Sequence, residues 1–189
     1  MKIYLIDQTN YLQQHLKNLQ QISVMPYAKE NIKEKITTIT INTATPFAKF
    51  NLQFLFDYAI FPKKIMTYLT QWSFENRAMQ VGDTIVQQVF LPPFGSLSQK
   101  IIFGVRIKDI IDEPNRKGFS YETLKGHLEK GLSVFTVEET ADNKLIFKIQ
   151  TFSKPGHILS QLGGPFIAVP YQSYCTRLAL NHVKQQLEK

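Results

Sequence analysis

The sequence predicts an α+β fold in which a curved antiparallel β-sheet wraps around one long C-terminal helix. Several strand-like segments follow one another after residue 100 without an intervening helix, and such strands pair antiparallel. Residues 165 to 187 then have helical periodicity and an apolar stripe that must be covered. The chain has 189 residues, 43% of them hydrophobic, which is enough for one substantial core. We therefore expect a single domain over residues 1–189.

The N-terminal third predicts a strand, a helix and a second strand. The apolar run of residues 3–6 is halted by Asp7, which suits a short strand. Leucines at helical spacing among polar residues predict an amphipathic helix over residues 9–20, with His15 beside its apolar face. The β-branched run of residues 36–43 predicts a strand.

The middle of the chain has weaker signals. Residues 50–61 are rich in Phe and Tyr but have no clear period. Pro62 suits a first helical position, and Ile65, Leu69 and Trp72 then predict the buried face of a helix that ends near Trp72. Turn residues on both sides of residues 84–91 predict a strand there.

Four further strands are expected between residues 100 and 152. Apolar residues at 101, 103, 105 and 107 alternate with polar ones, which predicts a strand with one wet face. Residues 118–124, 131–138 and 144–152 predict the next three, joined by turns at 112–115 and 142–143. The final helix has an apolar stripe made of Thr176, Ala179, Leu180, Val183 and Leu187.

Composition excludes several function classes. The net charge is +7, but the basic residues are scattered, so we expect no specific nucleic-acid partner. The N-terminal apolar run is too short for a signal peptide or a membrane span. The single Cys175 excludes an internal disulfide and fits a reducing compartment. We expect a cytoplasmic monomer or homodimer.

Metal, cofactor and catalytic signatures are absent from the sequence. The four histidines, at 15, 127, 157 and 182, are isolated. The glycines at 163 and 164 precede a helix but lack the full pattern of a phosphate-binding loop. Ser153 and His157 bracket a Lys-Pro pair, where closing a turn is the simpler role. We predict no metal site, no cofactor and no defined catalytic set.

Three sequence runs carry a family resemblance. They are Gly118-Phe-Ser-Tyr-Glu-Thr-Leu-Lys-Gly-His127, Phe152-Ser-Lys-Pro155 and Leu162-Gly-Gly-Pro165. This set resembles an uncharacterised family of bacterial and plant domains of unknown function, whose pattern is G-F-x-Y-x-T-L-x-G-H followed by F-S-R/K-P and a C-terminal helix. The likeness covers residues 56–185 and includes Trp72 and Gly82, whereas residues 1–45 lie outside it.

The resemblance implies membership of the START-like, birch-pollen-allergen-like superfamily. Its helix-grip fold holds apolar ligands between a curved sheet and a long helix, which agrees with the predicted order of elements. This chain departs from the family after the Gly-His pair: Leu128 stands where a proline is common, and Leu132-Ser133 where paired glutamates are common. If those glutamates do chemistry in other members, this member lacks it.

Candidate polar ligand-binding residues are Tyr121, Thr123 and His127. Tyr121 and Thr123 project to the same face of an extended strand, while Glu122 projects to the other. His127 follows Gly126, where the backbone can approach a ligand closely, and its imidazole can bind a ligand carboxyl or carbonyl. Candidate apolar walls are Trp72, Phe103, Phe135 and Phe147, although the same side chains could fill a solid core.

Three functions follow from this set. The first is binding of a small hydrophobic or amphipathic molecule, lipid-like or aromatic, in a cavity between the sheet and the C-terminal helix. It predicts a cavity of roughly 300 Å³ or more. The second is an enzyme of cyclase or hydrolase type that uses His127 and Tyr121. The third is a non-enzymatic interaction module, which predicts an exposed apolar patch.

Overall fold

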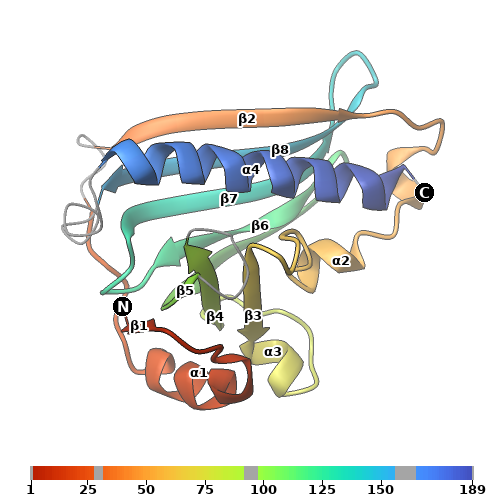
Figure 1. The fold of residues 1–189 in the computed structure, drawn as a ribbon. Helices are drawn as coiled ribbons and strands as arrows, with labels where there is room; N and C mark the ends of the chain where they lie inside the picture. The colour runs from red at the N-terminus through yellow and green to blue at the C-terminus, as the bar shows by residue number, and fades with distance from the viewer. Residues whose placement is uncertain (1, 28–31, 92–97, 156–164, 189) are drawn as a thin grey trace.

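In the computed structural model, eight antiparallel strands form one sheet in the order β2-β8-β7-β6-β5-β4-β3, and β1 pairs with β5 (Figure 1). The structure describes residues 2–27, 32–91, 98–155 and 165–188, so His157 and the glycines at 163 and 164 lie outside it. The strands are β1 (Lys2–Tyr4), β2 (Lys33–Ile41), β3 (Met66–Thr70), β4 (Thr84–Leu91), β5 (Gln99–Glu113), β6 (Arg116–Thr123), β7 (Glu129–Glu139) and β8 (Leu145–Pro155). The helices are α1 (Leu12–Gln20), α2 (Gln53–Phe56), α3 (Gln71–Phe74) and α4 (Pro165–Leu187).

The predicted fold class is confirmed: a curved antiparallel sheet grips a long C-terminal helix. In Figure 1, α4 runs along the inner face of the long strands β2 and β8. Its predicted stripe is buried at Ala179, Leu180, Val183 and Leu187. Because these side chains leave water against the sheet, the helix is held mainly by apolar burial.

Hydrogen bonds fix α4 at points along its length. The Tyr171 hydroxyl donates to the Phe90 carbonyl at 2.6 Å. Near the other end, the Gln186 amide donates to the Ala59 carbonyl at 3.0 Å. The Glu188 carboxylate, just past the helix, accepts from the Asn42 amide at 2.6 Å. These bonds are directional, so they fix the position of α4 along the sheet. Apolar burial is not directional and does not fix that position by itself.

Two glycines bring neighbouring strands unusually close. A Cβ atom on Gly118 in β6 would lie 1.9 Å from the Phe135 carbonyl oxygen, and one on Gly131 in β7 would lie 1.9 Å from that of Phe152. Only glycine fits at such an approach, and it commonly marks a sharp bend in a strand. A register shift in β5 between Ile107 and Asp109 adds a third irregularity. These irregularities accompany the curvature of the sheet.

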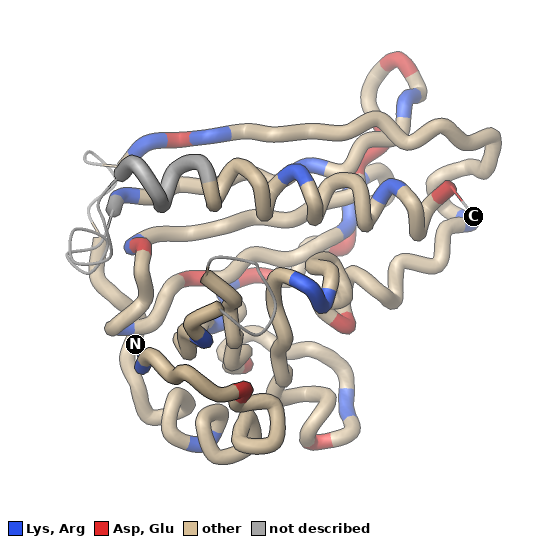
Figure 2. The backbone as a smooth tube through the Cα atoms, viewed as in Figure 1, with Lys and Arg blue, Asp and Glu red and all other residues tan. Residues whose placement is uncertain are grey.

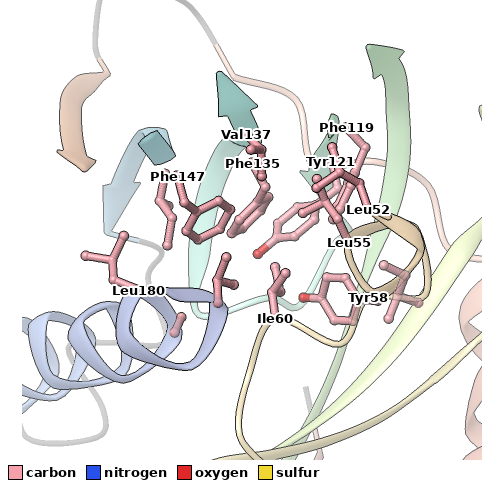
Figure 3. Close-up of a cluster of buried hydrophobic side chains, with 14 of the residues drawn as sticks. Leu52, Leu55, Tyr58, Ile60, Phe119, Tyr121, Phe135, Val137, Phe147 and Leu180 are labelled. Atoms are coloured by element: carbon pink, nitrogen blue, oxygen red, sulfur yellow. The ribbon is translucent and has the colours of Figure 1, made fainter. Parts of the chain in front are cut away.

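An aromatic cluster fills the space between the sheet and α2. Phe119, Phe135 and Phe147 come from adjacent strands of the sheet and are each at most 2% exposed. The Phe119 and Phe135 rings stack with centroids 5.4 Å apart. Figure 3 shows Leu55 and Tyr58, from α2 and the residues after it, closing the cluster. This cluster is the main core.

The outer face of the sheet is only partly wet, in contrast to the prediction for residues 101–107. Leu12 and Leu16 of α1 pack against Val86 and Ile102, forming a second, smaller core on that side. The prediction considered one strand in isolation, whereas α1 and β1 cover its outer face. Farther along the sheet the outer face carries the Lys108–Glu122 ion pair at 2.8 Å, as the alternation predicts for both residues.

The predicted helix over residues 62–72 is wrong. Residues 66–70 form strand β3, which pairs with residues 85–89 of β4, and only then does the short helix α3 begin. Thr70 caps α3, its hydroxyl accepting from the Ser73 amide at 3.2 Å. The spacing of three apolar residues suggested a helix, but pairing with β4 and the β-favouring Thr67 and Tyr68 decide for a strand.

Candidate ligand-binding cavity

A cavity of about 180 Å³ lies between the inner face of the sheet and α4. Strands β4 to β8 form its floor and residues 171–176 of α4 part of its roof. Most of the wall is apolar, contributed by Phe61, Met66, Val89, Phe103, Phe135 and Ile149. The cavity adjoins the core of Figure 3, whose Phe135 and Tyr121 belong to both.

A row of hydroxyl groups crosses the floor. Thr151, Ser133 and Tyr121 are register partners on β8, β7 and β6, so their side chains lie side by side on one face. All three line the cavity. Behind the row, the Gln87 amide donates to the buried Tyr58 hydroxyl. Figure 3 shows the hydroxyls of Tyr58 and Tyr121 turned toward each other.

Burial keeps these phenols neutral. It raises the pKa of Tyr121 and, even more strongly, that of Tyr58. Tyr58 also has a φ of +62°, which is unusual for a bulky side chain. The core holds this conformation in place because the Tyr58 ring contacts Tyr68, Phe119 and Tyr121. The floor therefore offers hydrogen-bond donors and acceptors but no charge.

The turn between β6 and β7 brings His127 to the cavity. Gly126 takes a φ of +89°, and the His127 amide closes the turn on the Leu124 carbonyl at 3.0 Å. The imidazole packs edge-on against Phe103, with ring centroids 4.2 Å apart. Its Nδ1 lies 3.0 Å from both the amide nitrogen and the carbonyl oxygen of Glu129, so it accepts from the first in one tautomer and donates to the second in the other.

His127 is neutral at physiological pH because burial lowers its pKa to about 4. Among the residues that the structure describes, no group bonds its Nε2. Within the described part of the chain, the imidazole bonds the backbone of Glu129 and no carboxylate. The imidazole is therefore a neutral group whose Nε2 can bond a ligand, as donor or acceptor according to its tautomer, and the described residues give it no orienting acid of the kind a histidine general base has.

Glu129 contributes the carboxylate of the cavity wall. Burial raises its pKa, opposed by a hydrogen bond from Ser153 and by the charge of Lys35. Gln172 of α4 also donates to this carboxylate, tying the helix to β7. Across residues 2–27, 32–91, 98–155 and 165–188, no ion pair includes Glu129. Among the residues described, the hydrogen-bond donors to this carboxylate are neutral, and Lys35 acts on it through its charge without forming an ion pair.

From α4, Tyr171 and Cys175 face the cavity one helical turn apart. Burial raises the pKa of both groups, so phenol and thiol are neutral at pH 7. Cys175 is the only cysteine of the chain. Its half-buried thiol makes it a specific reporter for occupation of the cavity.

Four of the seven predicted ligand-binding residues line the cavity: Tyr121, His127, Phe103 and Phe135. Phe147 and Trp72 lie outside the wall and are buried in the core. Thr123 is also outside it, and its hydroxyl accepts from the Gly131 amide at 3.1 Å. Thr123 thereby ties the two ends of the turn that carries His127.

Sequence reasoning missed most of the polar wall. Gln87, Glu129, Ser133, Thr151 and Gln172 line the cavity but are not among the predicted binding residues. One signal was available, since Glu129, Ser133 and Phe135 share strand parity and therefore one face of β7. Glu122 lies on the opposite face, as predicted, where the Tyr27 hydroxyl donates to it at 2.6 Å.

The cavity is smaller than the predicted 300 Å³ or more. A volume of 180 Å³ is close to that of an engineered protein cavity of about 150 Å³ that binds benzene. It therefore suits a single ring or a short branched chain and is too small to enclose a sterol or a long acyl chain.

A second hollow of about 330 Å³ lies between β1 and α1. Its wall includes Ile6, which is 67% exposed, and Tyr11, which is 52% exposed, so it is open to water. Ile3 and Leu5 of the same N-terminal segment are also exposed but do not line this hollow, whose wall includes Lys2, Gln8 and Gln14. An open groove of this kind does not enclose a small ligand.

Charge, metal ligands and helix hydropathy add three observations. Figure 2 shows Lys and Arg spread over several strands and helices of the described chain. No group of three or more metal-ligating side chains occurs among the residues described. None of the helices in that part of the chain has the length and apolar character needed to cross a membrane.

Comparison with known protein families gives a match over most of the chain. A family described as "Domain of unknown function (DUF1990)" matches residues 48–182. The chain belongs to the DUF1990 family. The match leaves out β2, although β2 pairs with β8 along its whole length in the DUF1990 sheet of this protein.

Three curated relatives are named UPF0548 proteins. The chain is 37% identical over 62 residues to one from Deinococcus radiodurans and 33% identical over 73 residues to one from Arabidopsis thaliana. It is 30% identical over 129 residues to one from Dictyostelium discoideum, covering 54% of this chain. The alignments cover 33% and 37% of this chain in the first two cases. They span only 31%, 36% and 56% of the three relatives' own lengths.

Solved structures share the fold at low sequence identity. The hypothetical protein jhp0584 of Helicobacter pylori aligns over 88% of this chain and 98% of its own, with a TM-score of 0.57 and 9% identity. A major latex-like protein of Panax ginseng aligns over 82% of this chain and 97% of its own, with a TM-score of 0.47 and 14% identity. The first similarity is one of fold alone.

Proposed function

We propose that this protein binds a compact, mainly apolar small molecule in the cavity between the sheet and α4. The observation that carries the proposal is an aromatic and aliphatic wall broken by one row of hydroxyls and one neutral imidazole. Apolar walls with a few placed polar groups are typical of small-molecule sites. We further propose that the protein acts in the cytoplasm as a monomer or homodimer.

The resemblance to the START-like superfamily supports this proposal, because that superfamily is known for apolar ligands held between sheet and helix. The range of ligands that we propose is nevertheless narrower than the range that the resemblance implies. Because the cavity measures about 180 Å³, we infer a single-ring or short-chain ligand. His127 and Tyr121 are the proposed polar anchors, and Phe103 and Phe135 the proposed apolar contacts.

The test uses toluene as a minimal probe of the apolar wall. Its affinity is measured by nuclear magnetic resonance titration of the labelled protein, while native mass spectrometry of the freshly purified protein detects any retained small molecule. In parallel, the alkylation rate of Cys175 is followed, and we expect saturating toluene to slow it at least severalfold because the thiol faces the same cavity.

Two variants of α4 control the test. Cys175→Phe places a ring in the cavity and is expected to abolish toluene binding. Tyr174→Phe changes the neighbouring residue, which is 41% exposed and does not line the cavity, and toluene binding should remain. Equal toluene affinity in Cys175→Phe and Tyr174→Phe would refute the proposal.

A further inference from the structure

We infer that the cavity selects a small primary amine, which binds as its ammonium form with the nitrogen against Glu129. The inference rests on the proposed function and specifies the charge of the ligand. Glu129 lines the cavity, and its carboxylate makes no ion pair with any residue that the structure describes. Glu129 is half-buried, and removing a carboxylate from water without an ion-pair partner costs free energy that a ligand cation would offset.

The neighbours of Glu129 supply hydrogen bonds but little positive charge. Gln172 and Ser153 donate to the carboxylate as neutral groups. Lys35 is the described cation whose charge reaches it, but its side chain is exposed and its Nζ bonds the Ser173 hydroxyl at 3.4 Å. Its charge lowers the pKa of Glu129 from a distance, but water screens part of that charge and Lys35 forms no ion pair with Glu129 among the described residues.

The other titratable groups of the wall are neutral at pH 7. Burial lowers the pKa of His127 and raises the pKa of Tyr121, Tyr171 and Cys175, and each shift favours the uncharged form. No cation on the described wall therefore opposes an incoming ammonium group. An anionic ligand would instead meet the carboxylate of Glu129 without a matching positive charge.

The remainder of the wall suits the rest of such a ligand. An ammonium group has three donors, and the hydroxyls of Ser133 and Thr151 lie in the same cavity as acceptors. The rings of Phe103, Phe135 and Tyr121 add favourable contacts with a cation and with an attached aromatic ring. With the volume of about 180 Å³, this points to one ring or a short chain bearing one amine.

A matched series of single-ring probes tests the charge preference. Toluene, benzyl alcohol, benzylamine and benzoate share a ring and differ mainly in the group at its side. At pH 7.5, titrations of the full chain should give benzylamine an affinity at least about tenfold above that of benzyl alcohol, with benzoate weakest. Benzyl alcohol or benzoate binding as tightly as benzylamine would overturn the inference.

The same series separates this inference from the proposed function. If toluene and benzyl alcohol bind but benzylamine gains nothing, the cavity is a ligand site without amine selectivity. If none of the four probes binds, the proposed function itself fails and the amine inference fails with it.

A pair of variants assigns the preference to Glu129. In Glu129→Gln the ratio of benzylamine to benzyl alcohol affinity should fall to about one, because the amide keeps an acceptor for Gln172 and removes the charge. In Glu113→Gln, an exposed carboxyl on β5 outside the cavity, the ratio should stay at the level of the unmodified protein. A ratio that persists in Glu129→Gln would contradict the assignment.

Discussion

His127 and Glu129, two residues apart on the same turn, are both displaced toward their neutral forms by the same cause. Burial lowers the pKa of the imidazole to about 4 and raises the pKa of the carboxyl. Neither finds an oppositely charged partner in the other, because the imidazole bonds the backbone of Glu129. Among the described residues, the Nε2 atom of His127 has no hydrogen-bond partner and the Glu129 carboxylate has no ion-pair partner, so both groups can bind a ligand in the cavity.

The displaced pKa of His127 makes stability depend on pH. The pKa falls from an ordinary 6.5 to about 4, so between these values the unfolded chain binds a proton that the folded protein does not. The stabilisation is therefore present above pH 6.5 and is lost as the pH falls toward 4. Because the ring is only partly shielded, we expect a loss of about 2 kcal/mol.

Urea unfolding of the unmodified protein and of His127→Gln, measured from pH 4 to pH 7, checks this prediction. The stability difference between the two should shrink as the pH falls. Glu129 has the opposite sign, since its raised pKa gives a contribution lost as the pH rises, but it is present in both proteins and cancels. Parallel stability curves would show that His127 does not carry the effect.

Some of the individual residues that line the cavity could be predicted from the sequence. Tyr121 and His127 could be chosen because a tyrosine of fixed strand parity and a histidine after a glycine are local features. Gln172 could not, because it meets Glu129 only after α4 docks on the sheet. Likewise, Phe135 lines the cavity while Phe147 fills the core, a difference set by packing between strands and helix and not by residue type.

At the scale of the elements, glycines in the strands β6 and β7 and glycines in the turns are required for different physical reasons. Gly118 has no room for a side chain because the Phe135 carbonyl oxygen occupies the Cβ position. Gly82, in the turn before β4, has a φ of +92° but nothing within 4 Å of that position. One site is therefore limited by space and the other by backbone conformation.

Alanine substitutions at these two positions are expected to differ. Gly118→Ala must separate β6 from β7 and should cost at least about 3 kcal/mol. Gly82→Ala should cost about 1 kcal/mol, the usual penalty of a left-handed backbone for alanine. Urea unfolding of both variants measures the difference, and equal costs would mean that the close approach at Gly118 relaxes easily.

Elements whose own sequence has a strong periodic pattern were predicted correctly. The element whose structure depends on pairing with another strand, β3, was not. The strand over residues 84–91 and the helix over residues 165–187 have clear periods and boundary residues, and both are confirmed. The five-residue strand β3 has three apolar positions that also suit a helix, and its pairing with β4 is decided by contacts formed in the folded protein.

At the scale of the whole molecule, the described residues form a core on each face of the sheet. Leu16 belongs to the smaller one, between α1 and the outer face, and is 1% exposed. Ile149 belongs to the larger one and also lines the cavity. The sheet separates the two sets of side chains, so stability and ligand binding can be altered independently.

Leu16→Ala and Ile149→Ala test this separation. Both remove buried apolar side chains and should cost about 2–4 kcal/mol each. Leu16→Ala should leave the toluene affinity unchanged, whereas Ile149→Ala enlarges the cavity and should shift preference toward bulkier rings. Titrations of toluene and of a dimethylbenzene, at a temperature where both variants are folded, measure this. A changed toluene affinity in Leu16→Ala would show that the faces are coupled.

The order of strands in the sheet has a consequence for biosynthesis. Lys33 in β2 pairs with Ser153 in β8, 120 positions later, and α4 follows every strand in the chain. A ribosome therefore releases the whole sheet before the helix that covers its aromatic face is available. Pairings between such distant segments form slowly. The emerging polypeptide therefore exposes that face until residues 165–187 are synthesised, and apolar surface exposed in this way makes a nascent chain prone to aggregation.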